Sequence, residues 1–536
     1  LLPPAKASGF PSRQFVMKKL FLSVTVLLLI LTSSGCKSSK KTVDPIDDNY
    51  RVVYQIFVGS FSDSNNDGIG DLKGIINRLD YLNDGDINSG KSLGVQLLWL
   101  SPIFKSPSYH KYDVSDYYSI DSDFGSEEDL KELITKCHER NVKVILDVAI
   151  NHTSTSHLWY LNFLAAHQSK NTASAYYDYY TCVTRDTMVS GRKYKQIPGT
   201  DEFYECNFSD DMPELNYDSE KVRQEVLDIA KYYLDLGVDG FRFDAVKYIY
   251  YGDTSSSVAF WKWYVDEIRK IRPDAYLVGE CWSADSEIYK YTAALNCFAF
   301  SASQAEGTIA AAAKGGNVNV FTSSTARALK NLQNSREDAM FIPFISNHDM
   351  DRSAGYLMMA NKWNYMAANL YILCAGSPVI YYGEEIGMKG TRGTANTDAN
   401  RRLAMLWGDG DTVQDPEGAT YDREKQTNGT VKEQMENTDS LYHYYAKLIA
   451  LRNKYPAIAR GNYSALALSD TFVGGFSIEY EGETIVLIHN TTSSEKRVDL
   501  SQITAASEIL DYIGQGNATL ENGVLTISAQ TSVILR

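Results

Sequence analysis

The feature that most constrains the fold is the alternation of short apolar runs with helical patterns between residues 50 and 455. The runs are rich in β-branched and aromatic residues, which is typical of buried parallel strands, and apolar residues at three- and four-residue spacing lie between them. Eight runs have this character: residues 51–57, 95–100, 142–148, 240–245, 275–280, 295–300, 341–346 and 378–382. Because strands and helices alternate eight times, we expect an α/β fold, a closed TIM-type (β/α)8 barrel.

Two stretches interrupt or follow this alternation. Residues 153–216 are rich in Tyr, Ser, Thr and Asn, and they are far longer than an ordinary βα loop of about 2–6 residues. They predict a small domain inserted after the third strand. Residues 456–536 change to period-two alternation with turn residues, which predicts a C-terminal antiparallel β-sandwich domain. The barrel then comprises residues 50–152 and 217–455.

The first 49 residues carry an export pattern. A basic start at Met17-Lys18-Lys19 precedes an apolar run over residues 20–31, which is too short for a membrane span and indicates a signal peptide. Residues 32–36 resemble a bacterial lipobox, in which Cys36 carries the lipid anchor. We expect residues 1–36 to be upstream sequence and signal peptide, and residues 37–49 to be a linker. The protein is then an exported lipoprotein anchored to the outer membrane, in the periplasm or at the cell surface; an ordinary cleaved signal is the alternative.

Charge and aromatic content narrow the choice of partners. The formal net charge is −15, a field that repels nucleic-acid phosphates, so no nucleic-acid partner is expected. The 37 Tyr, 20 Phe and 7 Trp include rings that suit a neutral, hydroxyl-rich ligand such as a sugar, although most rings pack in the core. The cysteines lack the spacing of a zinc site; Cys182 and Cys206 could pair, but buried free thiols are expected. These patterns leave the oligomeric state open.

Polar residues follow four of the expected strands. Active sites of (β/α)8 barrels lie at the carboxyl ends of the strands, so side chains at these ends should meet at one mouth. The candidates are Asp147, Asn151 and His152 after the third strand, Arg242, Asp244 and Lys247 at the fourth, Glu280 at the fifth, and His348 and Asp349 at the seventh. Because burying several carboxylates together is costly, such a cluster indicates chemistry.

Three of these carboxylates suit glycoside hydrolysis, which needs an acid, a second carboxylate across the anomeric carbon, and stabilisation of an oxocarbenium-like transition state. Arg242 precedes Asp244 by two residues, on the same strand face, and can hold that carboxylate ionised as a nucleophile requires. Glu280 is flanked on its side of the strand by Val278 and Trp282, apolar surroundings that raise a carboxyl pKa and suit a proton donor.

The four segments, in this order and spacing, resemble the signature regions of the α-amylase family of glycoside hydrolases, family thirteen, and the resemblance runs from about Tyr50 to Arg536. It implies a retaining double displacement with Asp244 as nucleophile, Glu280 as general acid/base and Asp349 as transition-state stabiliser. The same match implies that the sugar is bound or the site held together by Tyr112, Asp147, His152, Arg242, Lys247 and His348.

Two further segments refine the expected specificity. Met212-Pro-Glu-Leu-Asn216 is similar to the MPDLN motif of α-amylases intermediate between the oligo-1,6-glucosidase and neopullulanase groups, with Glu214 in place of Asp. Ala245 resembles the residue of enzymes that cleave α-1,4 bonds. The resemblance therefore implies an endo-acting α-amylase on starch and maltooligosaccharides. The alternatives are a cyclomaltodextrinase or neopullulanase-like hydrolase, a 4-α-glucanotransferase and, outside the enzymes, a catalytically silent carbohydrate-binding protein.

A loop after the first strand has the pattern of a calcium site. Oxygen-bearing side chains occupy alternate positions around a glycine turn, as in an EF-hand-like loop without its distal Glu. The expected ligands of Ca²⁺ are Asp63, Asn65, Asp67, the carbonyl of Ile69, and Asp71. The alternative is an Asx-rich turn without metal.

The resemblance also suggests a second calcium ion at the junction of barrel and insert. It would use Asn151 and Glu214. The change from Asp to Glu, together with Tyr248 where many α-amylases have His, argues against this second site.

Overall fold

The computed structural model describes residues 48–86 and 89–536. The predicted signal peptide, Cys36 and most of the predicted linker lie outside the described residues. Within the described residues, no helix combines the length and apolar character that crossing a membrane requires.

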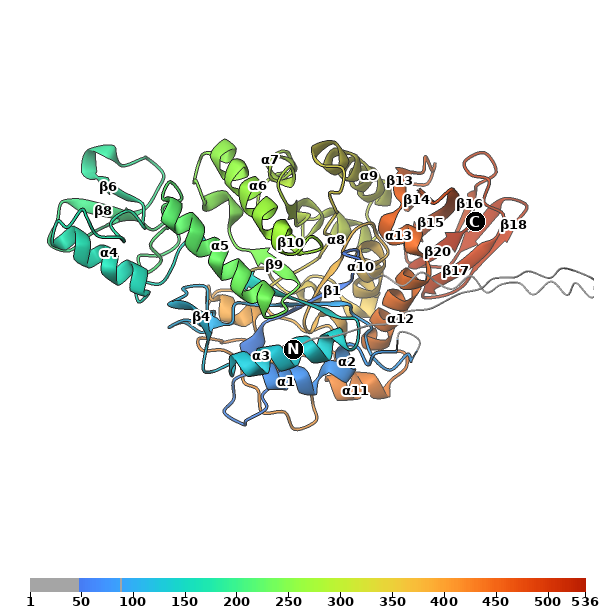
Figure 1. Cartoon of the computed structure of the whole chain (residues 1–536). Coiled ribbons are helices and arrows are strands. Elements are labelled where there is room, and N and C mark those ends of the chain that lie inside the picture. Colours follow the sequence, from blue (N-terminus) through green and yellow to red (C-terminus); the bar gives the residue numbers. More distant parts are fainter. Residues whose placement is uncertain (1–47, 87–88) are drawn as a thin grey trace, which may run out of the picture. The chain divides into compact units, whose positions relative to one another are not determined.

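A parallel sheet forms the centre of the barrel region (Figure 1), with the strand order β11-β10-β9-β5-β2-β1-β12. Its strands are β1 (Val53–Ile56), β2 (Leu97–Leu100), β5 (Lys143–Val148), β9 (Gly240–Phe243), β10 (Tyr276–Gly279), β11 (Asn296–Cys297) and β12 (Val379–Tyr381). Each lies within one of the runs expected from the sequence. The runs are buried on both faces, as strands of a barrel covered by helices must be.

The seventh expected strand, residues 341–346, closes the barrel without forming a regular ladder. It makes isolated parallel bridges from Ile342 to Phe298, beyond β11, and from Phe344 to Val379 of β12. Pro343 lies between these positions and has no N–H to donate, although its carbonyl accepts from the Val379 N–H at 2.9 Å. The predicted (β/α)8 barrel is therefore confirmed, but the seventh strand is irregular because of this proline.

Helices follow the strands, and most of them bury one face. They are α1 (Leu72–Asn77), α2 (Leu79–Leu82), α3 (Glu127–His138), α5 (Glu220–Asp235), α6 (Thr254–Ile271), α7 (Asp285–Thr292), α8 (Thr308–Ala313), α9 (Val318–Ser335), α10 (Trp363–Ile372), α11 (Val431–Glu436) and α12 (Leu441–Lys454). Of these, α10 is buried nearly all round. In α3 a capping box of Ser126 and Asp129 satisfies the first free N–H groups, and the apolar residues at three- and four-residue spacing are buried.

The region between β5 and α5 leaves the barrel. It contains α4 (Leu158–Gln168) and a small antiparallel sheet in the order β6-β8-β7, formed by β6 (Cys182–Thr184), β7 (Tyr194–Gln196) and β8 (Glu202–Glu205). In Figure 1 these elements stand together, apart from the barrel strands. A short hairpin of β3 (Phe104–Lys105) and β4 (Asp116–Ile120) lies in the loop after β2.

The C-terminal region forms two antiparallel sheets, which confirms the predicted β domain. After α13 (Pro456–Arg460), the first sheet has the order β13-β14-β15-β20-β17 and the second the order β16-β19-β18. The strands are β13 (Asn462–Ala465), β14 (Val473–Tyr480), β15 (Glu483–Asn490), β16 (Lys496–Asp499), β17 (Ile509–Gly514), β18 (Ala518–Glu521), β19 (Val524–Ile527) and β20 (Thr531–Leu535). Alternate residues of both sheets meet in one apolar core.

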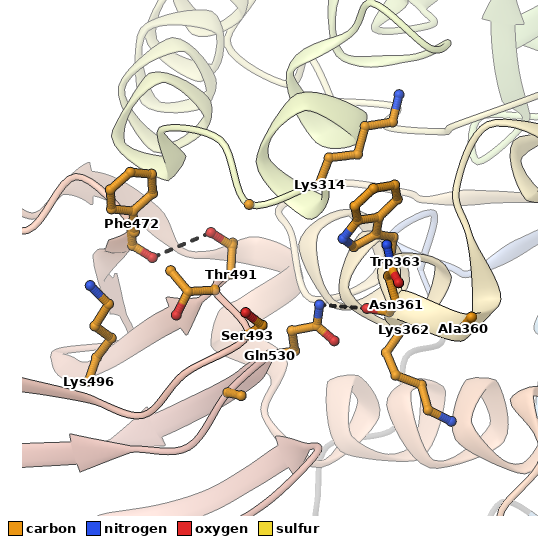
Figure 2. A pocket seen from close by; sticks show the side chains of 13 residues that line it. Lys314, Ala360, Asn361, Lys362, Trp363, Phe472, Thr491, Ser493, Lys496 and Gln530 are labelled. Carbon is orange, nitrogen blue, oxygen red and sulfur yellow. Dashed lines mark hydrogen bonds between the residues drawn. The ribbon is translucent and has the colours of Figure 1, made fainter.

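A groove of about 690 Å³ lies where the barrel helices meet this domain (Figure 2). Gln530, directly before β20, donates from its Nε2 to the carbonyl of Asn361 at 2.7 Å across the groove. Deeper in the interface, the buried Asn369 of α10 donates to Ser532 Oγ at 2.8 Å. Polar groups of both parts thus hold the C-terminal domain against the barrel.

Candidate active site

Arg242 is the centre of the polar cluster at the carboxyl ends of the strands. It lies on β9, and the sheet register places it beside Asp147 of β5 and Val278 of β10. Its fully buried guanidinium donates from Nη1 to Asp147 Oδ1 at 2.7 Å and to Asp244 Oδ1 at 2.8 Å. Its Nη2 donates to Glu280 Oε2 at 3.2 Å. One cation therefore joins carboxylates from three neighbouring strands, which offsets the cost of burying them.

Asp147 is held from its other side as well. Its Oδ2 accepts from the Trp99 indole at 3.1 Å and from the Tyr112 hydroxyl at 2.9 Å. The Tyr112 hydroxyl also lies 2.7 Å from His348 Nε2, and the rings of Tyr112 and His348 are nearly parallel, with centroids 5.6 Å apart. Gln55 of β1 contacts His348 Nδ1 at 2.7 Å. Tyr112 is fixed at its hydroxyl end while its half-buried ring remains partly accessible.

Asp349 is bound to two cationic or polar partners. Its Oδ1 accepts from Arg402 Nη2 at 2.8 Å, and its Oδ2 lies 3.0 Å from His348 Nε2. Burial alone would raise the pKa of this carboxyl, but His348 and Arg402 outweigh burial and hold the pKa well below its usual range. Asp349 is therefore a carboxylate at any pH at which the protein would work.

The pKa of Glu280 is shifted in the opposite direction to that of Asp349. Its Oε2 accepts from the backbone N–H of Ala245 at 3.1 Å, and Ala245 adopts a left-handed conformation, with φ of 51°, directly after Asp244. Burial first, and then the charges of Asp244 and Asp349, raise the pKa of Glu280 to about 8. A carboxyl that keeps its proton at neutral pH can donate it. The Trp282 ring, which the sequence placed against Glu280, stacks on Phe300 and is 40% exposed.

The remaining sugar-binding candidates lie around this cluster. His152 is buried, and in the described part of the chain its Nε2 has no hydrogen-bond partner. Burial lowers the pKa of His152, so its ring is neutral and can bond a hydroxyl. Lys247 donates from Nζ to the carbonyl of Trp282 at 2.6 Å. A hollow of about 560 Å³ opens beside Asp349, and Trp282 lines it.

Several residues with evident roles in the cluster carry no sequence signal. Arg402 lies in the long segment after β12 and also donates from Nη1 to the Tyr109 hydroxyl at 3.0 Å. Trp99 and Gln55 lie within apolar strands, where nothing in the sequence distinguishes a side chain of the site from one of the hydrophobic core. Their position opposite Asp147 and His348 follows from register, which the sequence alone does not give.

Residues 63–71 form the loop with the calcium pattern. Both oxygens of Asp63 accept backbone N–H groups of the loop, from Asn66 at 2.7 Å and Gly68 at 2.8 Å, among others. Asp71 caps α1 by accepting from the Gly74 N–H at 2.7 Å. Within residues 48–86 and 89–536, no Lys, Arg or His forms an ion pair with Asp63, Asp67 or Asp71. Three carboxylates without a cationic side chain, together with an amide oxygen and a backbone carbonyl, are the ligand types that Ca²⁺ prefers.

The second suggested calcium site would lie between Asn151 and Glu214. His152 and Glu214 form an antiparallel bridge, so Asn151 and Glu214 do lie close together. Burial, and next the charge of Glu205, raise the pKa of Glu214 to about 8. Glu205 itself is paired with the Arg192 guanidinium at 3.0 Å. The second calcium stays an untested prediction.

A buried arginine that joins carboxylates at the mouth of a (β/α)8 barrel, with one carboxyl protonated, is an arrangement suited to glycoside hydrolysis. The family description "Alpha amylase, catalytic domain" matches residues 55–461. The chain therefore belongs to the α-amylase family, family thirteen of the glycoside hydrolases, and is a glycoside hydrolase.

Individual relatives agree with this assignment. Alpha-amylase 3 of Dictyoglomus thermophilum is 34% identical, over 90% of this chain and 93% of that protein. An oligo-1,6-glucosidase of Bacillus cereus is 31% identical, with coverages of 88% and 95%, and a 4-alpha-glucanotransferase of Thermotoga neapolitana is 30% identical, with coverages of 83% and 96%. Among solved structures, Eubacterium rectale Amy13B superposes with a TM-score of 0.84 at 36% identity, over 92% of this chain and 96% of that one.

Proposed function

We propose that the protein is an endo-acting α-amylase that hydrolyses internal α-1,4-glucosidic bonds of starch and maltooligosaccharides with retention of configuration. The observation that carries the proposal is the Arg242 guanidinium, which contacts both Asp244 and Glu280. The shared guanidinium places the two carboxyl groups in one site, and their separation is the quantity that distinguishes retaining enzymes, at about 5–5.5 Å, from inverting ones, at about 6.5–9.5 Å.

In the first step, Asp244 attacks the anomeric carbon and forms a glycosyl ester. Glu280 gives its proton to the departing glycosidic oxygen, so that a neutral sugar leaves. In the second step, Glu280, now a carboxylate, takes a proton from water while the water oxygen attacks the same carbon and releases Asp244. The raised pKa of Glu280 supports its role as the acid, and the salt bridge from Arg242 supports an ionised Asp244.

The residues around the carboxylates would bind the sugar. Asp349, as a fixed carboxylate, can accept from two ring hydroxyls, and the unpartnered Nε2 of His152 can bond a third. The half-buried ring of Tyr112 offers a flat face for stacking. Asp147 would position Arg242 without touching the substrate, because its side chain is fully buried, whereas that of Asp349 is 32% exposed.

The proposed specificity for internal α-1,4 bonds is supported by Ala245, by the alpha-amylase named among the relatives, and by the hollow beside Asp349. The oligo-1,6-glucosidase and 4-alpha-glucanotransferase relatives keep the transferase and α-1,6 alternatives open. A cyclomaltodextrinase or neopullulanase-like activity is a further alternative within the same mechanism.

We further propose that residues 63–71 hold one Ca²⁺ through Asp63, Asn65, Asp67, the carbonyl of Ile69, and Asp71. The ion would offset two of the three negative charges and fix the start of α1; it would take no part in bond cleavage. We also propose that the protein is exported and lipid-anchored at Cys36, which the basic start, the apolar run and the lipobox-like residues support.

The product profile tests the specificity. Purified protein is incubated with amylose, a cyclodextrin and pullulan, and products are separated by chromatography at early times. An endo-amylase releases mixed maltooligosaccharides from amylose with new reducing ends. Faster attack on cyclodextrin or pullulan than on amylose would favour the cyclomaltodextrinase or neopullulanase-like alternative. Longer and shorter oligosaccharides without new reducing ends would contradict hydrolysis and establish a glucanotransferase.

A further inference from the structure

Three metal-binding side chains from distant parts of the chain meet in the inserted region. His167 lies near the end of α4, Cys182 begins β6 and Glu202 begins β8. One ligand atom of each lies within 4.8 Å of the others. Their separations along the sequence, 15 and 35 residues from His167, explain why no zinc spacing is visible in the sequence.

The imidazole of His167 is fixed in the orientation that a metal ligand requires. Its Nε2 lies 2.9 Å from the backbone carbonyl of Tyr177, an acceptor, so Nε2 carries the proton. The Tyr177 ring stacks on the imidazole with centroids 4.0 Å apart. In the neutral ring, Nδ1 then presents its lone pair to the cluster. A backbone carbonyl bonded to the outer nitrogen is the usual support of a metal-bound histidine.

The other two groups face this lone pair. Glu202 Oε2 lies 2.7 Å and Cys182 Sγ 3.9 Å from His167 Nδ1. Around a tetrahedral zinc ion, with bonds of about 2.0–2.3 Å, these pairs would be about 3.3 and 3.5 Å apart, so shifts of a few tenths of an ångström suffice. The His167 side chain is 2% exposed and that of Glu202 28% exposed, so an ion can enter from the side of the glutamate.

We propose that His167 Nδ1, Cys182 Sγ and Glu202 Oε2 form a Zn²⁺ site, with water as the fourth ligand. Nitrogen, sulfur and oxygen ligands together suit Zn²⁺, whereas Ca²⁺ and Mg²⁺ prefer oxygen alone. On binding, the thiol proton passes to solvent and the thiolate takes its place at the metal. The ion would tie α4 to both β6 and β8. The site is independent of the proposed glycosidase specificity. The competing explanation is an imidazolium–carboxylate ion pair.

Cobalt substitution distinguishes these explanations. The full-length protein is stripped of metal, reduced, saturated with Ca²⁺ to fill oxygen sites, and titrated with Co²⁺. A thiolate bound to Co²⁺ gives a near-ultraviolet charge-transfer band, which an oxygen-only site does not give. The variants are Cys182→Ser and Glu202→Gln. The matched control is Cys206→Ser, because Cys206 is a second free cysteine of the same region and is not part of the cluster.

If the site exists, each chain should bind one Co²⁺ and show the charge-transfer band. Added Zn²⁺ should displace the Co²⁺. Cys182→Ser should abolish the band, Glu202→Gln should weaken Co²⁺ binding by at least about tenfold, and Cys206→Ser should leave both unchanged. An absent band in the wild-type protein, with its fold retained by circular dichroism, would leave only the ion pair and overturn the proposal. Loss of the band in Cys206→Ser but not in Cys182→Ser would also overturn it.

Discussion

Arg242 joins Asp147, Asp244 and Glu280, three carboxyl groups that would repel one another if they were ionised without it. Their convergence could be predicted from the sequence, because polar residues at the ends of adjacent parallel strands must meet. The partners of the cluster could not. Arg402 reaches Asp349 from a segment without periodic pattern, so its place depends on tertiary packing alone.

At the residue scale, Asp244 is the proposed nucleophile. Asp244→Asn keeps the size of the side chain but removes the attacking carboxylate, so kcat on starch should fall by a factor on the order of 10⁴ or more, with unchanged folding. The control is Asp228→Asn on the exposed face of α5, which should retain full activity. Initial rates of reducing-sugar release check the prediction. Near wild-type activity in Asp244→Asn would refute the assignment.

Loss of the Glu280 proton should cause the fall in activity on the basic side of the pH profile. Because burial raises its pKa to about 8, the acid form dominates below that pH and is lost above it. We expect kcat/KM on maltooligosaccharides to fall as the pH rises through about 8. In Glu280→Gln this limb should vanish, and starch hydrolysis should lose far more rate than cleavage of an aryl glycoside whose leaving group needs no proton. Equal losses on both substrates would count against an acid role.

At the element scale, the apolar runs predicted where strands lie, but not how regular they are. Residues 341–346 have the composition of a strand, yet they form only two bridges because Pro343 cannot donate to a ladder. The inserted region shows a second limit of prediction from sequence. Its short strands β6, β7 and β8 lack strong alternation, and the contacts that this sheet makes with α4, such as Tyr160 with Tyr204, are not encoded in a local pattern.

The loop of residues 63–71 provides a prediction at this scale. If it binds Ca²⁺, removing the ion leaves three carboxylates without a cation beside the start of α1, and the melting temperature should fall. At 100 times the Kd, bound calcium contributes about 2.7 kcal/mol of stability. Thermal melts in EDTA and in excess Ca²⁺ measure this. The difference should vanish in Asp63→Asn, while identical melts of the wild-type protein under both conditions would exclude the site.

At the scale of the whole molecule, the barrel and the C-terminal β domain could be predicted because the spacing at which apolar residues recur differs between them. Their attachment was not, since it depends on buried polar residues that meet only in the folded chain. Asn369 of α10 donates to Ser532 Oγ and to the carbonyl of Ile513, and accepts from the Tyr444 hydroxyl at 2.7 Å. Nothing in the apolar helix 363–372 marks this asparagine as an interdomain contact.

Replacing Asn369 with Leu should therefore destabilise the molecule as a whole. The substitution removes both a donor and an acceptor from a buried interface, at a cost of about 2–4 kcal/mol. Urea unfolding followed by circular dichroism gives the change in the free energy of unfolding. The matched control is Asn162→Leu on the exposed face of α4, which should change it by less than about 0.5 kcal/mol. Equal stability of the two variants would show that Asn369 does not secure the domain.

The mechanism as a whole depends on two carboxyl groups that share one guanidinium and act from opposite sides of the anomeric carbon: Asp244 attacks one face while Glu280 protonates the group that leaves from the other. Proton NMR of the reducing end first released from a maltooligosaccharide tests this most directly, before mutarotation equilibrates the anomers. Double displacement at Asp244 predicts that the α anomer forms first and the β anomer appears only later. Initial formation of the β anomer would contradict the account.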